Sequence, residues 1–144
     1  LQRWMQLLLF ASGGRNGTRN PLLMLAATRG RLMELLATEL QPKDSAFSDK
    51  AFMVGIMSLM PALIGLPIQH IIAPLSLSSD VNAALSNGEG TLGNLLKLAE
   101  ASENGDLHQL TAAFSALGSL GPKALNRTQT QALQWANSIT ESRA

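Results

Sequence analysis

The stretch 21-PLLMLAATRGRLMELLATEL-40 decides the fold class of this chain of 144 residues. Pro21 suits the first turn of a helix, where its missing N–H would have no partner in any case, and Gln41-Pro42 should end the helix. Gly30 weakens it slightly. Leucines recur on one face at helical spacing, which predicts an amphipathic helix: Leu22, Leu25, Leu32, Leu36 and Leu40.

The same helical composition extends outward from this stretch in both directions. Leu, Ala and Met dominate, Tyr is absent, and Val occurs only at positions 54 and 81. Such a chain is rich in helix formers and poor in strand formers. We expect an all-α fold, an irregular bundle of about seven or eight short helices. The further helices are predicted over 1–11, 48–60, 67–73, 81–87, 91–103, 107–117 and from about 126–128 to 140.

Residues typical of helix ends set these boundaries. A helix begins most readily after Ser, Asp or Asn, whose side chains accept hydrogen bonds from the first free N–H groups. Glycine favours the left-handed conformation that ends many helices, and proline interrupts a helix. The predicted end residues are Ser48 and Asp49 at the start of one helix with Pro61 at its end, Ser78 to Asp80 before the next, Gly88 after it, and Asp106 with Gln109 in a capping box.

The composition also limits the classes of protein to which the chain can belong. Apolar residues make up 46% of it and charged residues 15%, which excludes disorder and fits a single helical domain over residues 1–144. Eleven basic against ten acidic residues give a net charge of +1, so we expect no nucleic-acid partner. The absence of cysteine fits a cytoplasmic location. Because Leu1 opens the chain without a Met or a leader, we expect a segment of a longer polypeptide.

No motif for catalysis, a metal or a cofactor stands out. Neither His70 nor His108 belongs to a His-Asp, His-x-x-x-His or His-x-Glu pattern, and the carboxylates fall mainly near predicted helix ends or on polar faces. The glycine-rich stretches 12–17 and 88–93 lack the pattern of a phosphate loop, and we expect them to be turns, although the second precedes a helix start where an anion can bind. We therefore predict no catalytic residue, no metal ligand and no cofactor.

Residues 51–79 contain no Asp, Glu, Lys or Arg, which raises the question of a membrane span. Pro61, Pro67 and Pro74 divide this run into pieces shorter than the roughly 20 residues that a spanning helix needs. We therefore expect the buried centre of a soluble bundle and no membrane span.

Part of this run is similar to a catalytic helix of known enzymes. Residues 52–65, FMVGIMSLMPALIG, resemble the helix on which HD-superfamily phosphohydrolases carry two metal ligands in a Gly-Leu-Leu-His-Asp-Ile-Gly pattern. Ser58 and Leu59 stand where the His and Asp would be. Because leucine cannot bind a metal and a neutral serine binds it poorly, the resemblance implies a degenerate site without hydrolase activity.

Six short motifs, spread in order over nearly the whole chain, resemble the HDOD domain of bacterial EAL-HDOD signal transduction proteins. Pro61 departs from the acidic residue expected in that subgroup. The resemblance implies a non-enzymatic module that follows an EAL domain, the part to which any phosphodiesterase activity would belong, and it implies that this chain is the C-terminal part of the HDOD domain. The motifs are 1-LQRW-4, 29-RGRLMELL-36, 74-PLSL-77, 81-VNAAL-85, 90-GTLG-93 and 132-ALQWA-136.

Our first hypothesis is a cyclic di-GMP-related signalling module that acts through contacts with a protein partner or the adjacent EAL domain, with a dimer through exposed apolar faces as a further possibility. Arg and Trp recur at interface hot spots, so the candidate interaction residues are Trp4, Arg29, Arg31 and Trp135; core packing and helix-surface charge are the alternative roles for all four. A second hypothesis is a metal-dependent phosphohydrolase that uses His70 or His108. A third is a helical domain that senses a small ligand such as a nucleotide.

Overall fold

The computed structural model describes residues 21–118 and 120–142, and every regular element among them is a helix, which confirms the all-α prediction. The helix predicted over 1–11, with Trp4, lies outside the described residues. The elements are α2 (Pro21–Leu40), α3 (Ser45–Met57), α4 (Met60–Ile64), α5 (Ile68–Ile72), the 3-10 helix η2 (Ala73–Leu75), α6 (Ser79–Asn87), α7 (Gly90–Asn104), α8 (Leu107–Leu117) and α9 (Pro122–Ser142).

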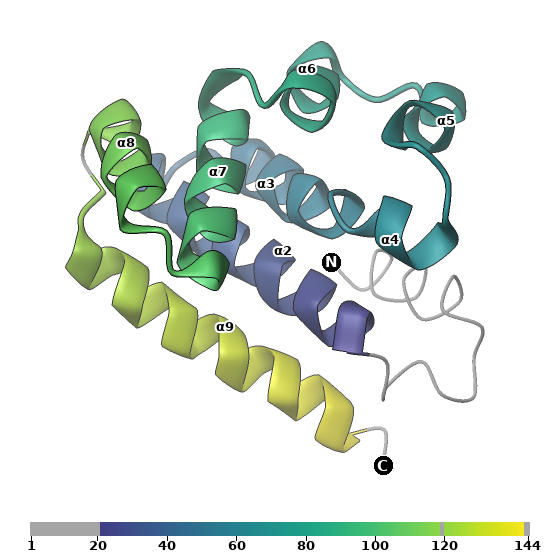
Figure 1. The fold of residues 1–144 in the computed structure, drawn as a ribbon. Helices are drawn as coiled ribbons and strands as arrows, with labels where there is room; N and C mark the ends of the chain where they lie inside the picture. Colours follow the sequence, from purple (N-terminus) through teal and green to yellow (C-terminus); the bar gives the residue numbers. More distant parts are fainter. Residues whose placement is uncertain (1–20, 119, 143–144) are drawn as a thin grey trace.

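The long helix α2 lies at the centre of the bundle (Figure 1). It packs against α3 along one side and against α9 along another, while α7 contacts both α2 and α3. The α6 and α8 helices flank α7, and α4 and α5 form one end of the molecule. Because α2 contacts four other helices, the stretch that predicts the fold class is also the element on which the bundle is assembled.

Two groups of buried apolar side chains form the core. The larger group joins α2, α3 and α7 through residues such as Leu36, Val54 and Leu95, and it extends to α6, α8 and α9. The smaller group joins the first half of α2 to the end of α3, to α4 and to α5, and its centre is Phe52. Fully buried aliphatic and aromatic side chains of this size each contribute about 1.5 to 3 kcal/mol, so these two groups are the main source of stability.

The crossing of α2 and α3 depends on a pair of glycines. A Cβ on Gly55 would lie 2.6 Å from the Cα of Gly30, and a Cβ on Gly30 would lie 2.9 Å from the side chain of Ile56. Real Cβ atoms do not approach other atoms so closely, so the two backbones pack against each other only because both residues are glycine. Gly30 thus lowers the helix propensity of α2 but allows its closest helix contact.

Several predicted helix ends are confirmed. The α2 helix begins at Pro21 and ends at Leu40 as predicted, Gly88 ends α6 with φ +67°, and the Asp106 side chain accepts a hydrogen bond from the Gln109 N–H at the start of α8. Pro61 lies in the first turn of α4, just after the interruption of the helix between α3 and α4.

Two predicted helix starts are wrong. Asp44, not Ser48 or Asp49, caps α3: its carboxylate accepts a hydrogen bond from the Phe47 N–H, so the helix begins one turn earlier. The α9 helix begins at Pro122 rather than near Asn126 to Thr128. Proline is favoured in the first turn of a helix, and here it begins α9 instead of continuing the preceding loop.

Within the part of the chain that the structure describes, one stretch, Ser45–Ile64, is long and apolar enough to cross a membrane, with a mean hydropathy of 1.4. Half of that window is buried inside the bundle, as in the core helix of a globular protein. The stretch is also not one continuous helix, because α3 ends at Met57 and α4 starts at Met60. These features fit a core role for the second half of α3. The predicted buried centre over 51–79 is wrong for residues 61–79, of which only Ile72 is buried.

Candidate functional site

The most highly connected polar side chain in the described residues is Arg29 of α2, which is only 7% exposed. Its guanidinium binds the Glu103 carboxylate of α7 with two hydrogen bonds: Nε donates to Oε2 at 2.9 Å and Nη2 donates to Oε1 at 2.5 Å. This two-point geometry is the strongest pairing that arginine makes with a carboxylate.

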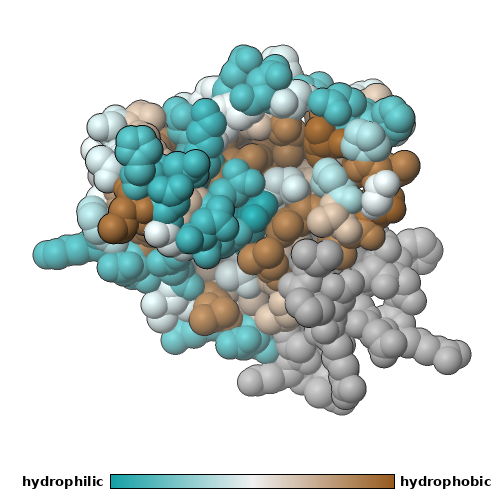
Figure 2. All heavy atoms as spheres, in the orientation of Figure 1, coloured by the Kyte–Doolittle hydropathy of each residue, from teal (hydrophilic) through white to brown (hydrophobic). Residues whose placement is uncertain are grey.

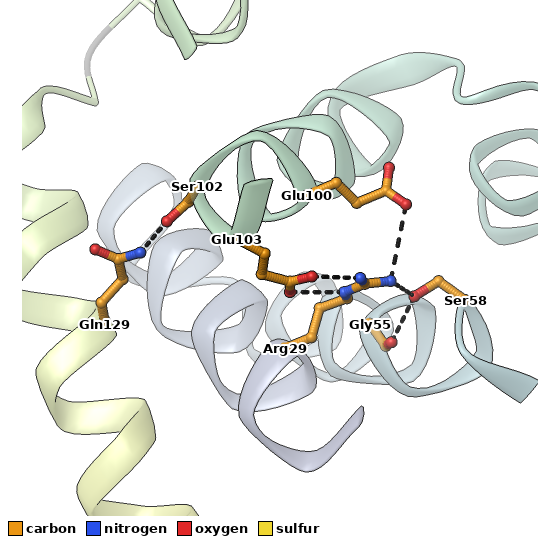
Figure 3. Close-up of polar contacts among 7 residues, drawn as sticks. All are labelled: Arg29, Gly55, Ser58, Glu100, Ser102, Glu103 and Gln129. Carbon is orange, nitrogen blue, oxygen red and sulfur yellow. Dashed lines mark hydrogen bonds and ion pairs between the residues drawn. The ribbon is translucent and has the colours of Figure 1, made fainter. Parts of the chain in front are cut away.

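The remaining nitrogen of the guanidinium, Nη1, faces the end of α3 (Figure 3). It donates a hydrogen bond to Ser58 Oγ at 2.8 Å, and the Ser58 hydroxyl in turn donates to the Gly55 carbonyl at 2.7 Å. A second carboxylate, Glu100, lies 3.8 Å from Nη1 and has a side chain that is 45% exposed. One buried positive charge is therefore shared between two carboxylates and a serine hydroxyl. We call Arg29, Ser58, Glu100 and Glu103 the Arg29 cluster.

Local sequence explains why these groups meet. Glu100 and Glu103 are three residues apart on α7, so they point to the same side of the helix. Ser58 is the C-cap residue of α3 and lies one turn after Gly55, whose contact with Gly30 brings α3 against the α2 backbone beside Arg29. The close helix crossing thus places a hydroxyl next to a guanidinium from another helix.

Polar contacts also tie α9 to the rest of the molecule. The Gln129 side-chain amide donates a hydrogen bond to the Ser102 hydroxyl on α7, next to Glu103 (Figure 3). Arg127 forms an ion pair with Glu39 at the end of α2. The last turns of α7 are therefore connected to α2 and α3 through Arg29 and to α9 through Ser102.

Arg31 and Trp135, two of the predicted interaction residues, lie against each other. The Arg31 guanidinium is 5.7 Å from the centre of the Trp135 ring and pairs with the mostly buried Glu34 at 2.6 Å. The Trp135 ring also packs edge-on against Phe52, with ring centres 5.9 Å apart. Both residues, like Arg29, make contacts inside the chain, and their role toward a partner stays a prediction.

The structure does not bring the two histidines together into a site. His70 is exposed on α5 and His108 is exposed on α8. Among residues 21–118 and 120–142, no three His, Cys, Asp or Glu residues are grouped so that they could hold a metal ion. The positions that correspond to the HD ligands do not fit a metal either, because Leu59 packs in the smaller apolar group and the Ser58 hydroxyl is engaged by Arg29.

The turn before α7 is the place where the sequence would allow an anion to bind, and its surroundings do not favour one. A small pocket of about 180 Å³ at this turn is lined by the carboxylates Asp80 and Glu89 and by Gly90. The Asp80 carboxylate accepts hydrogen bonds from the Ser78 hydroxyl and from Lys50, and these contacts lower the pKa of Asp80. The Val81 N–H makes a smaller contribution in the same direction. Two carboxylates therefore line this pocket, and one of them, Asp80, is paired with Lys50.

A larger pocket of about 560 Å³ lies between α7 and α8, within the size range of small-ligand sites. Alanines from α8 form an apolar floor, and Glu100, a member of the Arg29 cluster, lines the α7 side. Sequence reasoning did not identify this pocket, because only the packing angle of the two helices creates it. The lining residues are Asn94, Lys97, Glu100, Gln109, Ala112, Ala113 and Ala116.

The sequence also did not reveal the carboxylate partners of Arg29 and Arg31. Glu100, Glu103 and Glu34 were expected to be capping or solvated carboxylates, but Glu103 and Glu34 form ion pairs with buried or half-buried arginines. The only signal in the sequence was the i, i+3 spacing of Glu100 and Glu103, which also occurs on many solvated helices.

Comparison with known proteins gives one informative similarity. Over 85 residues, 59% of this chain, the sequence is 36% identical to a protein of Vibrio cholerae serotype O1 named cyclic di-GMP phosphodiesterase CdgJ. The matched region spans about a fifth of that protein, 19% of its length. No protein-family model and no solved structure matches the chain. The chain is thus similar to a short part of a protein whose name describes it as a cyclic di-GMP phosphodiesterase.

Proposed function

We propose that this chain is a non-catalytic module of a cyclic di-GMP signalling protein and that it works through contacts with another domain or another protein. Its similarity to CdgJ supports the signalling context, and the degenerate Ser58-Leu59 pair supports the absence of HD-type hydrolysis. In this proposal any phosphodiesterase activity resides in an EAL domain elsewhere in the polypeptide.

The observation that carries the proposal is an uncharged surface at one end of the bundle. We define the uncharged lobe as residues 58–79, which include α4, α5 and η2 and contain no Asp, Glu, Lys or Arg. Three of the five large apolar residues that are exposed in the described part of the chain lie in this lobe: Ile64 at 45%, Leu66 at 47% and Leu75 at 47%. Hydrophobic residues gather over this end of the molecule in Figure 2. Apolar patches of this kind often mark protein contacts.

The uncharged lobe is therefore a better candidate surface than the three described residues proposed from the sequence, Arg29, Arg31 and Trp135. Arg29 is buried, while Arg31 and Trp135 are engaged with each other. In contrast, the exposed side chains of Ile64, Leu66 and Leu75 have no charged neighbour within the lobe whose desolvation would oppose binding.

The test uses the full-length protein with Ile64→Asp and Leu75→Asp, and with Leu107→Asp as the matched control. Leu107 is also apolar and is 78% exposed, but it lies on α8 outside the lobe. We expect cross-linking between this segment and its domain or protein partner to fall in the two lobe variants and to persist in the control. Equal cross-linking in all three variants would contradict the proposal.

A second measurement separates this proposal from a hydrolase. We expect the purified chain to contain no stoichiometric metal and to leave cyclic di-GMP intact when Mn²⁺ is added. Hydrolysis that is lost in His70→Ala or His108→Ala would instead support a metal-dependent enzyme.

The pocket between α7 and α8 favours a second candidate function, the sensing of a small ligand. It presents one ammonium, one carboxylate and two carboxamides above an alanine floor, a mixture that suits a planar polar molecule such as a nucleotide. Ligand-dependent thermal stabilisation that disappears in Lys97→Ala would support this candidate.

A further inference from the structure

The Arg29 cluster disagrees with the metal site that the HD resemblance implies. One of the two corresponding positions, Leu59, is apolar and only 8% exposed. At the other, Ser58 Oγ accepts a hydrogen bond from a guanidinium at 2.8 Å. We infer that the Arg29 guanidinium occupies the place that a metal ion would take and acts as a built-in cation. This inference rests on the resemblance and on the cluster's geometry, and it is independent of the proposed function.

The guanidinium is surrounded by two carboxylates and a hydroxyl, which are oxygen groups of the kind that hard divalent cations also prefer. Glu103 offers both carboxylate oxygens, Glu100 offers a third carboxylate oxygen at 3.8 Å, and Ser58 offers a hydroxyl. Oxygen donors of this kind suit Mg²⁺ and Mn²⁺. In this chain they all face the Arg29 guanidinium, so a metal ion would meet a fixed positive charge among its ligands.

The built-in cation joins three helices of the bundle. Arg29 comes from α2, Ser58 from the end of α3, and Glu100 and Glu103 from α7. Arginine stays protonated at any accessible pH and cannot dissociate from the chain. The three helices are therefore held together without a bound ion, and chelators should not affect the fold.

The decisive experiment introduces a metal ligand with and without the guanidinium. Ser58→His adds an imidazole next to Glu100 and Glu103, and Arg29→Ala removes the competing cation. We expect the double variant to bind about one Mn²⁺ per chain in a calorimetric titration, and to bind it at least about tenfold more tightly than Ser58→His alone.

Two results of this titration would overturn the inference. If Ser58→His with Arg29 retained binds Mn²⁺ as tightly as the double variant, the guanidinium does not occupy the metal's place. If both variants are folded by circular dichroism and neither binds Mn²⁺, the carboxylates and residue 58 do not form a cation site.

A second comparison applies if the double variant does not fold. Arg29→Lys keeps a positive charge among the oxygen donors, whereas Arg29→Met keeps only the length of the side chain. We expect the melting temperature to fall clearly less for Arg29→Lys than for Arg29→Met, and we expect the unmodified chain to melt at the same temperature with EDTA or Mn²⁺. Equal losses for the two variants, or stabilisation of the unmodified chain by Mn²⁺, would contradict a built-in cation.

Discussion

At the scale of single residues, Arg29 shows how ion pairing can offset the cost of burying a charge. Taking a guanidinium out of water costs several kcal/mol, and the mutual attraction of the ions offsets this only when the geometry is good. Glu103 supplies that geometry with two parallel hydrogen bonds, whereas Glu100 is more distant and more exposed. The two carboxylates should therefore differ in their contribution to stability, although they are three residues apart on one helix.

We expect Glu103→Gln to lower the free energy of unfolding by about 2 to 3 kcal/mol, because it removes the carboxylate that binds the buried guanidinium at two points and leaves only the more distant Glu100 as a charged partner. Glu100→Gln should lower it by less than about 1 kcal/mol, since the Glu100 side chain is 45% exposed. Urea denaturation of both variants measures the difference. Equal losses would show that the paired geometry is not what stabilises the cluster.

Asp80 gives a prediction for the dependence of stability on pH. The hydrogen bond from the Ser78 hydroxyl is the largest influence and lowers the pKa of Asp80; burial, the next, raises it, and Lys50 lowers it again, so that the pKa is lowered on balance. A lowered pKa stabilises the fold above the pKa of the unfolded chain, and this contribution disappears as the pH falls through the pKa of the folded chain. We expect Asp80→Asn to cost less than about 1 kcal/mol at pH 7, because the Asp80 side chain is 48% exposed.

The thermal stabilities of Asp80→Asn and the unmodified chain should converge in strong acid. The exposed Asp49, which lies on α3 next to Lys50, gives the control variant Asp49→Asn. A difference between Asp80→Asn and the unmodified chain that stays constant from pH 7 into strong acid would refute the assignment of this stabilisation to the Asp80 charge.

At the scale of the helices, the α2–α3 crossing is a contact that tolerates little substitution. We expect Gly55→Ala to destabilise the chain by about 1 to 3 kcal/mol or more, because the new Cβ would lie 2.6 Å from the Gly30 backbone and force the helices apart. Gly121→Ala is the control, since no atom lies within 4 Å of the position of its Cβ. Thermal unfolding that places both variants at the same midpoint would contradict this account of the crossing.

The helices themselves could be predicted from local sequence, whereas some of their boundaries could not. The bounds of α2 follow from Pro21, the leucine spacing and Pro42, all of which act within the helix or next to it. The start of α3 was misplaced because Asp44 and Asp49 are equally suitable capping residues in the sequence, and packing decides between them. The break at Ser58 and Leu59 was predicted only approximately, since Pro61 belongs to the first turn of the next helix.

At the scale of the whole molecule, the candidate site depends on long-range contacts that one sequence does not reveal. Arg29 and Glu103 are 74 positions apart, and neither is unusual in its local context. The resemblance to an HD helix did identify Ser58, but not the arginine that faces it. The apolar composition of residues 51–79 predicted burial, and much of α3 is buried, whereas several large residues of the following segment are exposed.

Because the uncharged lobe carries no Asp, Glu, Lys or Arg, its binding to a partner should depend on salt and temperature in a characteristic way. Contacts between charged surfaces weaken as salt is added, because mobile ions screen them, but contacts between uncharged apolar surfaces do not. Hydrophobic association also weakens on cooling. Binding through Ile64, Leu66 and Leu75 should therefore persist from low to high ionic strength and loosen near 0 °C, a profile that cross-linking across a salt series and a temperature series would reveal. Such a module would bind its partner equally well in dilute and in concentrated salt, and less well in the cold.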